Sequence, residues 1–301
     1  MTIKNILVPL DGSKLSETVL PLAGLLAQQN QARLILFHAI EQNPPDTVHG
    51  ERHLTNQQEA SAYLDKVSQS LPTGIIVDRH VHTSAEKNVA NSIVQHSKEL
   101  GVDLIAMCAH GQSGLQKRIF GNIAQDVLNM GYVPVLLLSP EKELRVESCS
   151  CQRILVPLDG DPDHEAGLEM AVGLSKTCHA SLHLVMVIPE LSTLPGEQAA
   201  SAVLLPTATS ALLDMDCEEG ELYLVGLMGK LIDKHIPVTG EVQRGDPAKQ
   251  IVRVAKEFQA DMIILGTHSK TASDAFWSGS VTPKIATQTH LPLLLVPVHD
   301  S

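Results

Sequence analysis

The sequence predicts an α/β protein of two tandem domains, each a doubly wound parallel sheet of five strands with helices packed on it. Three observations support this prediction. The chain has 301 residues, about twice the common domain length of roughly 150 residues. Its opening motif occurs a second time, and short apolar strands alternate with helical periodicity in both halves. We therefore expect one sheet in each half.

Three matched segments define the internal repeat. Asn5-Ile-Leu-Val-Pro-Leu-Asp-Gly12 returns 148 residues later as Arg153-Ile-Leu-Val-Pro-Leu-Asp-Gly160. The segments that begin at Val102 and Tyr132 return 158 residues later. The second copy therefore has a net insertion of ten residues, which we place within residues 191–210 and interpret as a surface loop rather than a lid or a partner surface. The predicted domains are residues 1–140 and 153–301, joined by a charged linker over residues 141–152.

The first copy shows the expected elements in order. Ile6 to Leu10 is short and continuously apolar, as a strand buried on both faces requires. Ser13 to Ala27 carries apolar residues at helical spacing, and Ser13 suits the N-cap. The remaining strands are expected at residues 33–39, 75–82, 103–107 and 135–138, and the helices near residues 56–71, 89–100 and 122–129. Because ligands bind beyond the carboxyl ends of such strands, the residues after strands one, two and four are the candidates.

Composition excludes several classes of protein. The net charge is −12, of which residues 1–148 contribute −3 (12 basic, 15 acidic) and residues 149–301 contribute −9 (10 basic, 19 acidic). An acidic chain with 3% aromatic residues is poorly suited to nucleic acid. The apolar runs are far shorter than the ~20 residues of a membrane-spanning helix. With no signal-peptide pattern and five dispersed cysteines, we expect a cytoplasmic protein with reduced thiols and no metal site.

An aspartate follows the first strand of each copy: Asp11 and Asp159, both in Pro-Leu-Asp-Gly. A carboxylate there could accept a hydrogen bond from a ribose hydroxyl or an adenine amino group, while the glycine lets the chain turn sharply. The same carboxylate could instead cap the turn or the helix. Spacing alone leaves both interpretations open.

A loop bracketed by glycines follows the fourth strand of each copy. In the first, Met107-Cys-Ala-His-Gly111 is followed by nine residues and then Gly121-Asn122-Ile123. In the second, Leu265-Gly-Thr-His-Ser269 is followed by nine residues and then Gly279-Ser280-Val281. Backbone N–H groups of such a loop, with the dipole of the next helix, can hold an anion. Neither loop matches a P-loop or a dinucleotide G-x-G-x-x-G motif.

Opening strand, loop and closing strand together resemble the universal stress protein family in its tandem form, over essentially the whole chain. ATP-binding members carry Gly-x-x-Gly, nine residues, then Gly-Ser/Thr around the phosphates. In the first copy Cys108 replaces the first glycine and Asn122 replaces Ser/Thr, whereas in the second Ser269 replaces the second glycine. The resemblance implies Rossmann-like domains of the adenine nucleotide-binding type, with ATP as ligand and Mg²⁺ held through its phosphates. It also implies antiparallel pairing of the fifth strands.

The resemblance further implies two sets of nucleotide-binding residues. Those of the first domain are Pro9, Asp11, Ala39, Met107, His110, Gly111, Gly121, Asn122 and Ile123. Those of the second are Pro157, Asp159, Val187, Leu265, Gly266, His268, Gly279, Ser280 and Val281. Lys117 and Arg118, together with the less acidic first half, favour the first site for a triphosphate. Against it, Cys108 places a side chain where close backbone approach is needed.

We therefore expect a stress-response protein that binds ATP as a conformational or signalling ligand and is not a dedicated enzyme. Its expected partners are the adenine nucleotide and its own paired domains; a homodimer stays open, and nucleic acid and membrane are not expected. No carboxylate pair, activated nucleophile or metal cluster assembles from the motifs. Two alternatives remain. One is a slow ATPase that uses His110 or His268, and the other is a structural, partner-binding protein whose nucleotide sites have decayed.

Overall fold

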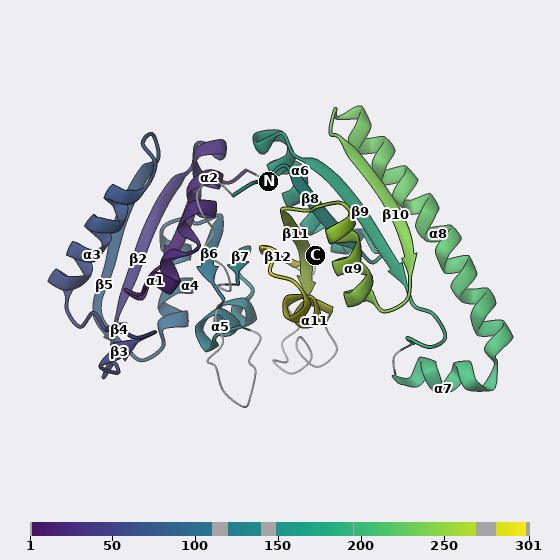
Figure 1. The fold of residues 1–301 in the computed structure, drawn as a ribbon, viewed down its shortest axis with the longest axis horizontal. Coiled ribbons are helices and arrows are strands. Elements are labelled where there is room, and N and C mark those ends of the chain that lie inside the picture. Colours follow the sequence, from purple (N-terminus) through teal and green to yellow (C-terminus); the bar gives the residue numbers. More distant parts are fainter. Residues whose placement is uncertain (1, 110–119, 140–148, 195, 269–280, 299–301) are drawn as a thin grey trace. The chain divides into compact units, whose positions relative to one another are not determined.

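The computed structural model describes residues 2–109, 120–139, 149–194, 196–268 and 281–298, which form two compact units (Figure 1). The first unit runs to Ser150 and includes Pro292–Pro297, and the second runs from Cys151 to Leu291 and includes Val298. Most of the predicted linker, residues 141–152, lies outside the described residues. In the described part of the chain, no helix is both long and apolar enough to cross a membrane.

The first unit is built on a parallel sheet in the order β5-β2-β1-β6-β7. Ile6, Leu7 and Val8 of the central strand are completely buried, as the continuous apolar run predicts. The strands are β1 (Asn5–Pro9), β2 (Arg33–Glu41), β5 (Ile76–Glu86), β6 (Leu104–Cys108) and β7 (Val135–Leu138). Helices α2 (Leu20–Asn30), α3 (Gln57–Ser70) and α4 (Val89–Glu99) pack on this sheet, and α5 (Asn122–Met130) packs on α4. The predicted α/β fold is confirmed.

The first predicted helix is divided in two. α1 (Lys14–Glu17) has Thr18 as its C-cap, and α2 begins at Leu20. Pro21 explains the break, because it has no N–H to donate and its ring would clash with the carbonyl of Glu17 in a continuous helix. Ser13 is the N-cap of α1, as predicted, and its hydroxyl accepts a hydrogen bond from the Ser16 N–H at 3.2 Å.

The second unit has four parallel strands in the order β10-β9-β8-β11. They are β8 (Arg153–Leu158), β9 (Ser181–Ile188), β10 (Val238–Arg244) and β11 (Met262–His268). The other described elements are a 3₁₀ turn η2 (Pro162–His164) and helices α6 (Ala166–Cys178), α7 (Gly196–Leu204), α8 (Pro206–Asp233), α9 (Pro247–Glu257) and α11 (Val281–Gln288).

The inserted segment is helical, so the prediction of a surface loop over residues 191–210 was wrong. α7 and the start of α8 occupy most of it. Residues 197–205, Glu-Gln-Ala-Ala-Ser-Ala-Val-Leu-Leu, are rich in alanine and leucine, which favour helix. Beyond it, Leu213, Leu224 and Leu231 of α8 are buried where α8 packs on β9 and β10.

An aspartate at the start of the fourth strand of each copy holds the first strand in the same way. The Asp103 carboxylate accepts hydrogen bonds from the backbone N–H groups of Lys4 and Asn5 at 2.8 and 2.9 Å. The Asp261 carboxylate accepts them from the backbone N–H groups of Gln152 and Arg153 at 2.9 and 2.8 Å. The sequence repeat is therefore a structural repeat at the level of single contacts.

The last strand, β12 (Leu293–Val298), groups with the first unit. Its residues Leu293 to Leu295 pair antiparallel with β7, with Leu294 opposite Leu136. These residues are at most 3% exposed. An uncovered apolar strand would expose unpaired backbone groups to other chains, and this pairing covers it. The expected antiparallel pairing of the fifth strands is thus present.

Candidate functional site

The residues predicted for the first site lie at the carboxyl edge of the first sheet. Strand order reverses at β1, because β2 lies on one side of it and β6 on the other, and doubly wound folds bind ligands at such a point. Pro9 is the last residue of β1 and Asp11 follows it, Ala39 lies near the end of β2, and Met107 lies near the end of β6. The topology therefore brings residues from three adjacent strands to one edge.

The N-terminus of α5 lies at the same edge, because α5 connects the carboxyl end of β6 to the start of β7. Gly121 is its N-cap, without a side chain to cap the helix, and Asn122 and Ile123 open the first turn. That turn has no acidic residue, so the positive end of the helix dipole is not offset there. His110 and Gly111 lie outside the described residues.

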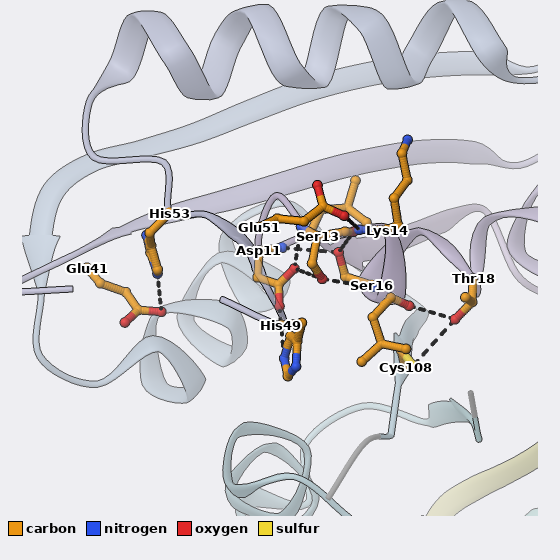
Figure 2. Close-up of polar contacts among 12 residues, drawn as sticks. Asp11, Ser13, Lys14, Ser16, Thr18, Glu41, His49, Glu51, His53 and Cys108 are labelled. Carbon is orange, nitrogen blue, oxygen red and sulfur yellow. Dashed lines mark hydrogen bonds and ion pairs between the residues drawn. The ribbon is translucent and has the colours of Figure 1, made fainter. Parts of the chain in front are cut away.

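The Asp11 carboxylate holds the turn that follows β1 (Figure 2). Its Oδ1 accepts hydrogen bonds from the N–H and the hydroxyl of Ser13 at 2.9 and 2.6 Å, and its Oδ2 lies 3.6 Å from His49 Nε2. Burial opposes ionisation, but the hydrogen bonds from Ser13 and Ser16 and the nearby His49 outweigh it and lower the pKa of Asp11. Of the two interpretations left open by the sequence, the turn contact is present. Each carboxylate oxygen has two lone pairs, so acceptor capacity for a ligand remains.

A small hairpin that the sequence did not predict packs beside Asp11. It consists of β3 (Thr47–Val48) and β4 (Glu51–Arg52), paired antiparallel. The two residues of its turn, His49 and Gly50, have φ values of 49° and 82°. Two positive φ values are typical of a type I′ turn, which suits the twist of a tight hairpin. Gly50 was the one sequence signal for this turn.

The hairpin and the residues just after it contact the turn after β1 at three points, and Figure 2 shows the two polar contacts. His49 faces Asp11, and the Glu51 carboxylate accepts a hydrogen bond from the Lys14 N–H at 2.9 Å. Leu54 packs against Gly12, where an added Cβ would lie 3.0 Å from the leucine side chain. Gly12 also has φ of 95°, so the turn requires glycine for both space and conformation.

A buried histidine, His38, lies next to Ala39 in β2. It is 2% exposed, and its Nδ1 donates a hydrogen bond to the Leu10 carbonyl at 2.7 Å, since a carbonyl can only accept. Its Nε2 is buried with no hydrogen-bond partner among the described residues. Burial lowers the pKa of His38, so the neutral ring is favoured.

The pairing of β2 with β5 shifts register between Ala39 and Glu41, and such irregularities often lie beside functional sites.

Cys108, which replaces the first glycine of the family motif, is the last residue of β6 and is buried. The Thr18 hydroxyl donates a hydrogen bond to its sulfur at 3.4 Å (Figure 2). Burial raises the pKa of this thiol to about 11. The side chain therefore packs as a protonated thiol against the break between α1 and α2.

The second site differs at the equivalent aspartate, Asp159. Its Oδ1 accepts a hydrogen bond from the Asp161 N–H at 3.1 Å, and its Oδ2 accepts one from His164 Nδ1 at 2.6 Å. His164 Nε2 lies 3.6 Å from the Asp161 carboxylate. The Asp159 side chain is 55% exposed against 24% for Asp11. The same tetrapeptide thus leads to different surroundings.

Gly266 has a packing role in the second unit. A Cβ on Gly266 would lie 2.9 Å from the His164 carbonyl oxygen, and one on Gly167 would lie 2.9 Å from the Gly266 nitrogen. Both glycines allow η2 and α6 to approach β11. The other predicted second-site residues fall in or beside the elements of this unit: Pro157 in β8, Val187 in β9, Leu265 and His268 in β11, and Val281 at the start of α11. Gly279 and Ser280 lie outside the described residues.

No metal centre accompanies these sites in the described residues. Among them, no three His, Cys, Asp or Glu side chains are arranged to hold a metal ion.

The fold of the two units, and the turns at the carboxyl ends of their strands, are those of a tandem doubly wound α/β protein. The model of the universal stress protein family matches the chain twice, over residues 2–139 and 151–297, so the chain belongs to this family. A universal stress protein of Mycolicibacterium smegmatis is 21% identical over 299 residues, which covers 97% of this chain and 96% of that protein. One from Methanocaldococcus jannaschii is 28% identical over 145 residues, 48% of this chain and 81% of that protein. A crystal structure of a universal stress protein from Archaeoglobus fulgidus has the same fold, with a TM-score of 0.64 and 19% identity over 99% of this chain and 98% of that one.

Proposed function

We propose that this protein binds ATP, with Mg²⁺ on the phosphates, at the carboxyl edge of the first sheet, as a conformational or signalling ligand rather than a substrate. One observation carries the proposal. Asp11, Ala39 and Met107 come from three adjacent strands to the point where strand order reverses, and the N-terminus of α5 returns to the same edge. This combination suits a nucleotide. The carboxylate can accept a hydrogen bond from the nucleoside, the apolar side chains can contact the base, and the N-terminus of the helix can bind the phosphates.

Each part of the nucleotide has a proposed partner. The ionised Asp11 accepts a hydrogen bond from the ribose or the adenine, while Pro9, Ala39 and Met107 line the base. The phosphates lie at the N-terminus of α5, with Gly121, Asn122 and Ile123, and the loop residues His110 and Gly111 complete their cradle. Lys117 and Arg118 in that loop add positive charge.

The second site is the weaker candidate in this proposal. The imidazole of His164 donates a hydrogen bond to Asp159 Oδ2 at 2.6 Å, whereas the histidine beside Asp11 lies 3.6 Å from Oδ2. The second half of the chain carries a net charge of −9 (10 basic, 19 acidic), which disfavours a triphosphate. The proposal also keeps the cytoplasm as the compartment, where thiols stay reduced, and leaves further association of chains open.

Isothermal titration calorimetry with ATP and with AMP, in the presence of Mg²⁺, tests the proposal. We expect micromolar binding of ATP to one site. Asp11→Ala should weaken it at least about tenfold, as loss of a charge-assisted hydrogen bond does, and Asp159→Ala should leave it unchanged. Circular dichroism of each variant checks that the fold is kept.

Absence of binding at millimolar nucleotide would contradict the proposal and favour a structural, partner-binding protein. Phosphate release, measured in the same samples, separates a ligand from a substrate. Steady release that depends on His110 would instead support the slow ATPase.

A further inference from the structure

Two cysteines that are far apart in the sequence meet at the amino-terminal edge of the second sheet. Cys151 lies two residues before β8, and Cys178 is the last residue of α6, just before the turn into β9. β8 and β9 pair in parallel, with Arg153 opposite Ser181. This pairing brings the segment that precedes β8, which contains Cys151, close to the segment that precedes β9, which contains Cys178.

Hydrogen bonds to backbone groups hold both segments in place. The Ser181 N–H donates to the Gln152 carbonyl at 2.7 Å, and the Gln152 N–H donates to the Asp261 carboxylate at 2.9 Å. On the other side, the Ser175 hydroxyl donates to the Ala180 carbonyl at 2.6 Å. The segments that carry the two cysteines are therefore both anchored at this edge of the sheet.

The two thiols are in direct contact and are not equivalent. The Cys151 S–H donates a hydrogen bond to the Cys178 sulfur, which lowers the pKa of Cys178 and raises that of Cys151. Thr177 Oγ1 also lies 3.8 Å from the Cys178 sulfur. Burial and the C-terminal end of α6 oppose a thiolate at Cys178. Cys151 is 3% exposed, whereas Cys178 is half-buried, so Cys178 is the thiol that a small oxidant reaches.

We propose that Cys178 and Cys151 form a redox-sensitive dithiol that a hydroperoxide oxidises to a reversible disulfide. The Cys178 thiolate attacks one oxygen of hydrogen peroxide, the O–O bond breaks, and a sulfenic acid forms as the first water leaves. Cys151 then gives up its proton and attacks the sulfenic sulfur, so that the S–S bond forms and the second water leaves. In total, two thiols lose two electrons and two protons, and the peroxide is reduced to two waters.

The disulfide would tie the end of α6 to the chain that enters β8, within the second unit. A cellular dithiol reductant would reverse it by thiol–disulfide exchange. This use of cysteine fits a compartment in which disulfides are transient and act as sensors. It does not depend on nucleotide binding at the first site.

Thiol counting after oxidation tests this inference. The reduced protein is treated with a small excess of hydrogen peroxide, denatured, and alkylated with N-ethylmaleimide, and its intact mass is measured. We expect the number of alkylated thiols to fall from the five in the sequence to three, with a mass loss of about 2 Da before alkylation. Dithiothreitol should restore all five.

Single variants identify the pair. Cys178→Ser should abolish the loss of thiols. Cys151→Ser should leave a sulfenic acid at Cys178, captured by dimedone. Cys149→Ser and Cys217→Ser should still lose two thiols, as matched controls. The inference is overturned if all five thiols of the unmodified sequence stay reactive after peroxide, or if Cys151→Ser and Cys178→Ser lose two thiols as before.

Discussion

Asp11 and Asp159 follow identical tetrapeptides, yet their carboxylates have different partners. Ser13 supplies both an N–H and a hydroxyl to Asp11, whereas Asp159 contacts the Asp161 N–H and His164. The position after the first strand could be predicted from the motif, because topology fixes where each strand ends. The partners could not, since they depend on residues outside the repeated motif.

The variant Ser13→Ala tests whether Ser13 lowers the pKa of Asp11. The folded-state pKa of Asp11 lies below 3.8, so its contact with Ser13 stabilises the fold above about pH 3.8, and this contribution is lost as pH falls through the folded-state pKa. Removing the hydroxyl should raise the pKa of Asp11 and lower the free energy of unfolding at neutral pH by about 1–2 kcal/mol, which includes the loss of the α1 N-cap.

Carboxyl-carbon NMR titration measures the pKa of Asp11 directly. Ser68→Ala is a matched control, because its hydroxyl donates to the Asp65 carbonyl, away from the site. An Asp11 pKa at or above 3.8 in the unmodified protein would contradict this account.

Among the elements, the strands were the most predictable part of the fold. The central strands β1 and β6 are continuous apolar runs inside a parallel sheet, so the sequence alone indicates them. The break between α1 and α2 could have been predicted from Pro21. The hairpin of β3 and β4 could not, because its strands have two residues each and no periodicity can show in so short a segment.

α8 provides an internal comparison of glycines. An added Cβ at Gly226 would meet no atom within 4 Å outside the neighbouring backbone of α8, whereas at Gly220 it would lie 3.2 Å from Met186 Cε. Gly226→Ala should therefore stabilise α8 by about 0.5–1 kcal/mol through helix propensity. Gly220→Ala should gain less or lose stability, because Met186 must move.

Hydrogen exchange of the α8 peptides, read by mass spectrometry, compares the two variants. Slower exchange in Gly226→Ala than in the unmodified protein is the expected result. If exchange in Gly220→Ala is slowed as much as in Gly226→Ala, the contact with Met186 does not reduce the gain in stability at position 220.

For the whole molecule, the tandem organisation could be predicted because the strand motif and the closing segments both recur. The structure adds three features that the sequence did not predict: the hairpin beside Asp11, the buried His38, and the contact between Cys151 and Cys178. Each joins residues that are distant in sequence through turns and registers that only the folded chain defines. The first-site residues that the structure describes lie at one edge of the sheet, and nucleotide binding there is the central proposal.

Methyl NMR of the protein labelled at its eight methionines tests that proposal most directly. Met107 lies at the end of β6 in the first site, Met186 contacts Gly160 beside Asp159 in the second unit, and Met130 lies at the far end of α5. Titration with ATP and Mg²⁺ should shift the Met107 methyl resonance saturably, leave Met130 unchanged, and leave Met186 unchanged at the same concentrations. A Met107 resonance that stays fixed at millimolar ATP, with or without movement of Met186, would contradict nucleotide binding at the first site.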